Sequence, residues 1–187
     1  TASYSALEIA EIFDTFGGEL NAATARDYTV VYARVLDEHL DTALDVMTDM
    51  VFAPSLADLD SEREVVLEEI AMVEDNPQDL VHDLAADVVF GGHPLGRPVI
   101  GTAAVIAAVS PRALRSFHGG AYVGPNVVVS AAGNVRHERL VELIAERGFD
   151  AEQVDAEIAA DKVREQSLGL VFGQAASMPV ESTQDDA

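Results

Sequence analysis

The fold is organised around one stretch of sequence, Glu62-Arg63-Glu64-Val65-Val66-Leu67-Glu68-Glu69-Ile70. Its glutamate, arginine and leucine residues favour helices, and its valine and isoleucine residues form an apolar seam, so the stretch predicts a helix. Glu62 and Glu69 are two helical turns apart and therefore point to the same side. Two such carboxylates form either a solvated surface or part of a divalent-metal site. The spacing alone favours the solvated surface, so the surrounding sequence has to decide.

Composition and charge restrict the class of protein. The chain has 187 residues, of which 49% are hydrophobic, as in a globular domain with or without a tail. The formal net charge of −22 disfavours binding to nucleic acid or to an anionic membrane. It is compatible with attraction of basic peptides, and equally with solubility or adaptation to high salt. Cysteine is absent, which excludes disulfides, zinc–thiolate sites and cysteine nucleophiles.

The pattern of elements predicts an α+β fold. Helices are expected at 5–16, 40–52, 57–75, 80–90, 103–109, 110–117 and 136–147, and strands at 19–24, 28–36 and 126–133. Ser5 and Glu8 have the spacing of a capping box, and Gly17-Gly18 ends the first helix. The first two strands form a hairpin, so we expect a mixed, largely antiparallel sheet covered by helices.

The chain divides into a domain and a tail. Residues 1–149 carry the regular patterns, whereas residues 150–187 are polar and acidic and predict a linker or a disordered tail. No apolar run is long enough to span a bilayer, so we expect no membrane partner. We expect the protein to be cytoplasmic.

Five short motifs occur in a definite order. They are Gly17–Thr24, then Tyr28-Thr29 with Tyr32 and Arg34, then Glu62–Ile70, then His93-Pro94-Leu95-Gly96-Arg97 with Ile100-Gly101, and then Ala131-Ala132-Gly133-Asn134-Val135. Together they resemble the amino-terminal domain of the pitrilysin/insulinase family of zinc peptidases, in the bacterial branch related to mitochondrial processing peptidase. The resemblance covers residues 1–149, rests on the order of individually weak motifs, and implies the α/β sandwich of that family.

The resemblance implies a zinc-dependent metalloendopeptidase. Members of the family bind zinc through two histidines of an H-x-x-E-H motif and a glutamate on a later helix, while the glutamate inside the motif is the general base. The resemblance places the distal zinc ligand at Glu69. It gives the Glu62 carboxylate a supporting role in the site, without a bond to the metal. Glu68 points about 100° away from Glu69 and is expected to be solvated.

The H-x-x-E-H motif is not in this sequence. The five histidines are His39, His82, His93, His118 and His137, and no two have the required spacing. The family's usual separation from Glu69 puts the motif just before Thr1, so we expect a truncated chain. With at most one of three zinc ligands, this chain alone is expected to be inactive. We expect His93 to have a structural role in its Pro/Gly loop.

The strand at 19–24 is the expected substrate site. The resemblance implies an edge strand at which Asn21, Ala22 and Ala23 bind an extended peptide or unfolded polypeptide through its backbone. An ordinary sheet strand explains the same residues equally well. We further expect Arg34 to pair with a carboxylate of the site. The resemblance also implies a second homologous half or subunit as partner.

Two other functions remain open on sequence grounds. The family includes non-catalytic subunits that act as scaffolds or in substrate recognition, although retention of both Glu62 and Glu69 favours the enzyme. The third possibility is an acidic α/β binding module, which the missing histidine motif supports. Sequence immediately before Thr1 would discriminate among them.

Overall fold

A computed structural model describes residues 1–148 and 170–174. Its helices are α1 Ala6–Phe16, α2 Leu40–Phe52, α3 Leu59–Asp75, α4 Pro77–Phe90, α5 Ala103–Ala108, α6 Pro111–Ala121 and α7 His137–Glu146. Its strands are β1 Glu19–Thr24, β2 Thr29–Arg34, β3 Val127–Ser130 and β4 Leu170–Gln174, with short 3-10 turns η1 Asp37–His39, η2 Pro94–Gly96 and η3 Gly124–Asn126. No helix in the described part of the chain is long and apolar enough to cross a membrane.

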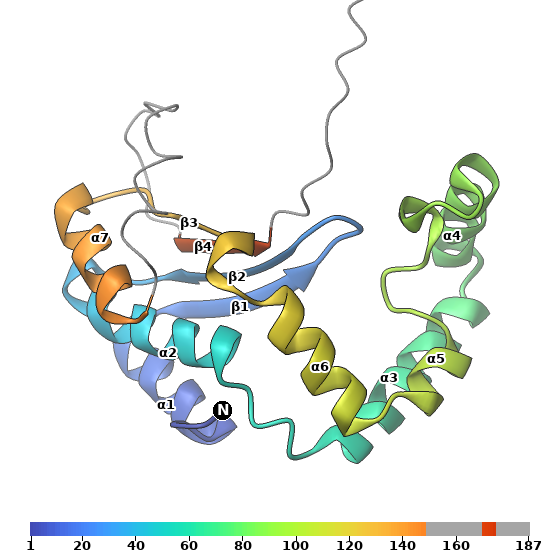
Figure 1. The fold of residues 1–187 in the computed structure, drawn as a ribbon, viewed down its shortest axis with the longest axis horizontal. Helices are drawn as coiled ribbons and strands as arrows, with labels where there is room; N and C mark the ends of the chain where they lie inside the picture. Colours follow the sequence, from blue (N-terminus) through green and yellow to red (C-terminus); the bar gives the residue numbers. More distant parts are fainter. Residues whose placement is uncertain (149–169, 175–187) are drawn as a thin grey trace, which may run out of the picture.

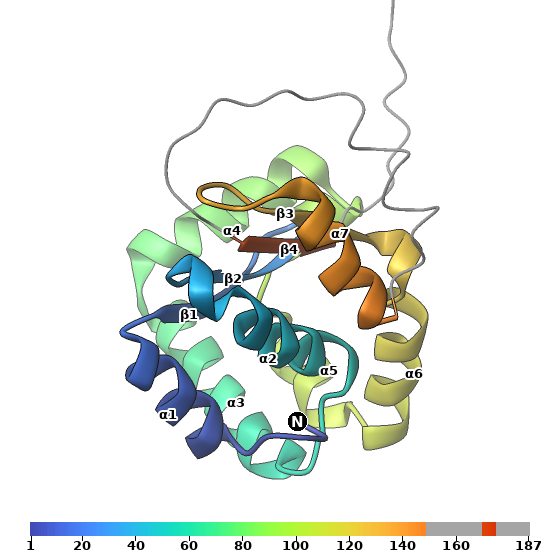
Figure 2. The same cartoon turned by 90° about the vertical axis from the view of Figure 1, so that its left-hand side faces the viewer.

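The strands form one antiparallel sheet. Their order is β1-β2-β4-β3, so β1 is an edge strand. Helices α1, α2 and α7 lie on one side of the sheet (Figures 1 and 2). This arrangement confirms the α+β class and the antiparallel sheet covered by helices.

Strand β4 lies where the sequence predicted linker or tail. Residues 170–174 pair with both β2 and β3, and so complete the sheet between them. The apolar run Leu170-Val171-Phe172 has strand propensity, but its place between two distant strands depends on non-local pairing that composition does not show. The rest of the expected tail lies outside the described residues, and the domain boundary stays a prediction.

The hydrophobic core lies between the sheet and its helices. Helix α2 contributes an apolar face with helical spacing, and β2 contributes alternate residues. Its buried members are Phe13, Val31, Ala33, Val35, Leu40, Ala43, Leu44, Val46, Met47, Val51, Leu143 and Ile144. The core therefore belongs to α1, α2, α7 and the sheet, and α3–α5 contribute none of these residues.

Helix α1 begins and ends as the sequence predicts. Ser5 accepts a hydrogen bond from the Glu8 amide, and the Glu8 side chain accepts one from the Ser5 amide. The bond from the Ser5 amide holds the pKa of Glu8 below its ordinary value. Gly17 ends the helix at φ 62°, a left-handed conformation that favours glycine. Because Gly17 ends α1, β1 follows it directly from Glu19.

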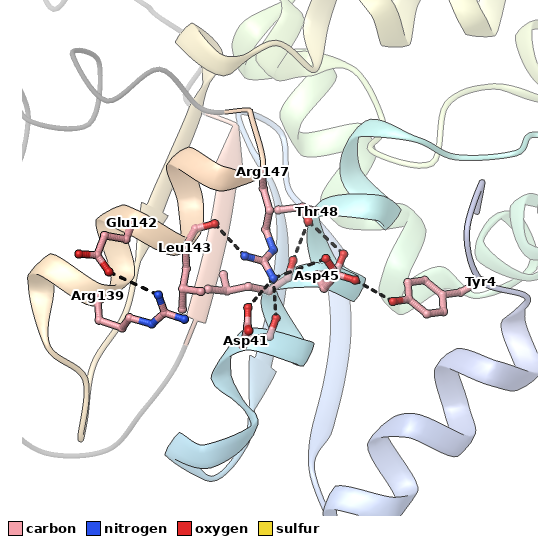
Figure 3. Close-up of polar contacts among 9 residues, drawn as sticks. Tyr4, Asp41, Asp45, Thr48, Arg139, Glu142, Leu143 and Arg147 are labelled. Atoms are coloured by element: carbon pink, nitrogen blue, oxygen red, sulfur yellow. Dashed lines mark hydrogen bonds and ion pairs between the residues drawn. The ribbon is translucent and has the colours of Figure 1, made fainter.

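Arg147, just after α7, joins that helix to α2 (Figure 3). Its guanidinium lies 2.6 Å from the Asp41 carboxylate and 3.5 Å from that of Asp45, and donates to the Leu143 carbonyl at 2.8 Å. The Tyr4 hydroxyl donates to Asp45 at 2.7 Å, and this hydrogen bond raises the pKa of Tyr4. The carboxylates of α2 thus hold both α7 and the amino-terminal segment.

Replacing Arg147 by methionine should lower the free energy of unfolding by about 1–3 kcal/mol, because hydrogen bonds between charged groups are lost from a site only 13% exposed. Asp41 and Asp45 are half exposed and can be rehydrated, which limits the cost. Urea unfolding measures the change. The control is Arg139→Met, which breaks only the exposed pair with Glu142 and should cost less than about 1 kcal/mol. Equal losses would contradict the role given to Arg147.

Helices α3, α4 and α5, with η2, form an outer helical unit. Helix α3 packs against α4 and α5, and α4 packs against η2. Figure 1 shows this unit set apart from the sheet, with α6 running between them. We call α1, α2, α7 and the four strands the sheet unit. The candidate site residues are therefore divided between two units.

Candidate functional site

Glu62 and Glu69 lie on α3, two turns apart, as the sequence predicts. Both side chains are exposed, and among the described residues neither carboxylate makes a hydrogen bond or an ion pair. Val65 and Met72 lie on the same side of α3 and are 48% and 71% exposed. This face of α3 therefore offers two uncommitted carboxylates beside two exposed apolar side chains.

Arg63 holds α3 in place from the other side. Its Nε donates to the Ile106 carbonyl at 3.2 Å, its Nη2 donates to the Val109 carbonyl at 2.8 Å, and its Nη1 pairs with Asp60 at 2.5 Å. Carbonyl groups at a helix end lack partners within the helix, so Arg63 satisfies the end of α5 and joins it to α3. Sequence reasoning missed this role because backbone carbonyls more than forty residues away leave no local signal.

The carboxylates and the expected substrate strand lie on different units. Helix α3 packs on α4 and α5, and its ribbon lies apart from β1 in Figure 1. The structure thus brings Glu62 and Glu69 together, and separately brings Asn21, Ala22 and Ala23 together on β1. Among the described residues, no hydrogen bond or ion pair joins the two sets directly.

Three of the five histidines, His39, His93 and His118, have structural contacts. His93 Nδ1 accepts the Leu95 amide at 3.2 Å and caps η2, which confirms its expected structural role. His118 Nε2 lies 2.7 Å from the Val51 carbonyl, and His39 stacks on Phe16 with ring centroids 4.0 Å apart. Within residues 1–148 and 170–174, no group of three or more His, Asp or Glu side chains is placed to hold a metal ion.

The donor chemistry of α3 fits part of a zinc site. Zinc in a hydrolytic site takes three protein ligands from histidine, glutamate or aspartate and keeps one position for water. The Glu69 carboxylate is exposed and uncommitted, so it can serve as one of these ligands. The described residues supply no complete set with it.

Strand β1 exposes backbone groups along the open edge of the sheet. The Ala25 amide donates to the Tyr28 carbonyl at 2.8 Å, which makes these residues a hydrogen-bonded pair of the hairpin. Hydrogen-bonded pairs alternate along an antiparallel ladder, so Ala23 and Asn21 also bond to β2. The amides and carbonyls of the residues between them therefore point outward, namely those of Leu20, Ala22 and Thr24.

One outward amide is occupied by a neighbouring side chain. Asn21 Oδ1 accepts the Ala22 amide at 2.8 Å. Asn21, Ala22 and Ala23 are all exposed. At Ala22 and Ala23 an added strand would meet only small side chains, and at Ala22 it would also meet this one internal bond. We expected Arg34 to pair with a carboxylate of the site, but it does not reach the carboxylates of α3. Its guanidinium lies 3.7 Å from Glu19 instead, because Arg34 and Glu19 are opposite each other in the β1–β2 pairing.

A hollow of about 370 Å³ lies between α4 and the loop that follows it. It is lined by Asp83, Leu84, Asp87, Gly91, Gly92, Gly96, Arg97 and Pro98. None of the site residues expected from the sequence is among them. No residue of α3 or β1 therefore lines the hollow.

Comparison with known proteins identifies a matching family and several relatives. The family model described as insulinase (peptidase family M16) matches residues 1–103, which include β1 and all of α3. Uncharacterized zinc proteases are 45% identical over 148 residues in Mycobacterium leprae, 47% over 146 in Streptomyces coelicolor and 46% over 137 in Bacillus subtilis. These matches cover 78%, 77% and 72% of this chain and 33%, 32% and 34% of the relatives. The chain thus spans about a third of the length of the curated relatives it matches.

Proposed function

The chain belongs to the insulinase family of peptidases, family M16, and from this premise we propose that it is part of a zinc-dependent metalloendopeptidase. The reaction is hydrolysis of a peptide bond by metal-activated water. One observation supports a specific zinc ligand: Glu69 has an exposed carboxylate without a hydrogen bond or ion pair to any described residue, on a helix within the matched segment. The matched relatives, named as zinc proteases, support the choice of metal.

In this proposal Glu69 is the distal zinc ligand. The other two ligands and the general base come from an H-x-x-E-H segment that is not in the present sequence. The Glu69 carboxylate makes no hydrogen bond or ion pair with the described residues, so binding a metal would break none of those interactions. Arg63 contributes by holding α3 on α5, so that the face carrying Glu69 has a fixed orientation.

Glu62 has the supporting role in the same site. It lies two turns before Glu69 on the same exposed face. A carboxylate in that position accepts hydrogen bonds from ligands or water around the metal, which orients them and raises their basicity. It does not bind the metal itself.

The substrate is an extended peptide or unfolded polypeptide that adds to β1 as a further strand. It would pair with the outward backbone groups of Leu20, Ala22 and Thr24, and would displace Asn21 Oδ1 from the Ala22 amide. Small side chains at Ala22 and Ala23 permit the close approach. Since the pairing is through the backbone, it makes little demand on substrate sequence.

A second homologous half or subunit would complete the enzyme. The chain corresponds to about a third of each matched relative, so a large part of such a protein lies outside it. We propose that the substrate is enclosed between this domain and that second half. In this proposal the natural protein is longer than this chain and includes the H-x-x-E-H segment, and activity should be measured in that longer natural protein.

The chain of 187 residues by itself should hold far less than one zinc ion per molecule and should not cleave a quenched peptide. One carboxylate cannot replace three ligands and a general base. Metal analysis after incubation with zinc and dialysis, followed by a fluorescence assay, checks both points. Stoichiometric zinc would contradict this expectation and would direct a search for other ligands to His39, His82 and His93.

The longer natural protein gives the positive test. With an H-x-x-E-H segment present, it should hold one zinc ion and cleave the same peptide, and a chelator should abolish the cleavage. If the longer protein lacks that segment and does not bind zinc, the proposal is wrong and a non-catalytic scaffold or recognition subunit is favoured.

A further inference from the structure

Arg26 occupies the tip of the hairpin between β1 and β2. With Asp27 it connects the paired residues Ala25 and Tyr28. The hairpin tip points toward the outer helical unit (Figure 1). The Arg26 side chain is 27% exposed, which is low for an arginine in a turn of two residues.

The guanidinium of Arg26 bonds the outer helical unit at three atoms. Its Nη1 donates to the Leu95 carbonyl at 2.9 Å and to the Arg97 carbonyl at 2.5 Å. Its Nη2 lies 2.9 Å from the Asp83 carboxylate on α4. The planar guanidinium presents several donors in a fixed geometry, so one side chain can hold all three acceptors together.

The loop that Arg26 holds is closely packed on the end of α4. Gly96 is buried, and a Cβ there would lie 2.7 Å from the Gly91 carbonyl, so the backbone passes α4 too closely for any side chain. The Gly96 amide donates to the His93 carbonyl at 2.9 Å, and the Arg97 amide donates to the Pro94 carbonyl at 3.1 Å. The Leu95 and Arg97 carbonyls are therefore presented by a turn packed on α4.

We propose that Arg26 is a positioning residue that sets the distance between the substrate edge β1 and the Glu69 face of α3. The connection runs from β1 through Arg26 to α4 and η2, and from α4 to α3, which pack against each other. The effect of Arg26 on catalysis rests on the proposed function, whereas its effect on the distance does not. Substrate on β1 and metal on α3 would belong to different units, and a displacement of about 1 Å between reacting groups can cost about 100-fold in rate.

The distance itself can be measured without any activity. Because the chain has no cysteine, Ala23→Cys and Glu68→Cys place two spin labels, one on β1 and one on α3, in an otherwise unlabelled protein. Both positions are exposed. Pulsed electron–electron double resonance should give one narrow distance distribution, and Arg26→Ala should broaden and shift it. Arg26→Lys, which lacks the planar set of donors, should give an intermediate distribution.

The control for charge is Arg115→Ala on α6. Arg115 is exposed and makes no hydrogen bond or ion pair within the described residues, so the same loss of charge should leave the distribution unchanged. Coinciding distributions for the Arg26→Ala and unsubstituted chains would overturn the proposal. So would an equal broadening by Arg115→Ala.

The catalytic consequence is tested in the longer natural protein. Arg26→Ala should lower kcat by about 100-fold with zinc content unchanged, and Arg26→Lys should restore part of it. An unchanged kcat would overturn the positioning role. If the unsubstituted longer protein neither binds zinc nor cleaves peptides, the proposed function fails, whereas the distance measurement still decides whether Arg26 positions the two units.

Discussion

Glu69→Gln in the longer natural protein should remove most of its zinc and lower its peptidase activity by more than about 100-fold, beyond the range typical of supporting residues. The amide is a weaker ligand than the carboxylate, and its neutral charge no longer offsets that of the zinc ion. Glu69 is exposed and its carboxylate holds no other described residue, so the change should leave folding intact. Zinc content, cleavage of a quenched peptide and the unfolding midpoint measure these three outcomes.

Two neighbouring glutamates provide matched controls. Glu62→Gln should cost on the order of 10–100-fold in metal affinity or activity, because Glu62 supports the site without binding the metal. Glu68→Gln should be nearly neutral, because Glu68 is exposed on another side of the same helix. Equal losses in all three variants, or a severe loss confined to Glu68→Gln, would mean that another face of α3 carries the site.

Leu44→Ala should lower the free energy of unfolding by about 2–5 kcal/mol, a large fraction of a typical domain's total of about 5–15 kcal/mol. Leu44 is 0% exposed, and its neighbours in the core, Ala43 and Met47, are likewise 0% exposed. Truncation leaves a cavity in a core shared by α1, α2, α7 and the sheet, which can close only by moving several elements. Urea unfolding followed by circular dichroism measures the loss.

The control for Leu44 is Leu7→Ala on α1, where the leucine is 68% exposed. Little apolar surface returns to water there, so the change should stay within about 0.5 kcal/mol. Similar losses at both positions would show that α2 does not form the centre of the core.

Elements with local signals were predicted well. The capping box of Ser5 and Glu8, the hairpin and α2 all depend on residues a few positions apart. The sequence predicts a helix from residue 80, whereas α4 begins three residues earlier, at Pro77. Asn76 in fact ends one helix and caps the next, since its side chain accepts the Gln78 amide.

The sequence by itself determined that Glu62 and Glu69 share a helix face and that the first two strands form a hairpin, because helical period and turn residues act over short distances. The resemblance predicted that β1 is an edge strand, and the structure confirms it; only the tertiary structure decided that β4 completes the sheet and that Arg63 and Arg26 bind carbonyls of distant segments. Those contacts join residues more than forty positions apart. These contacts depend on the tertiary arrangement of the chain. Every residue has the same backbone carbonyl, so no local sequence pattern indicates which carbonyl an arginine will bind.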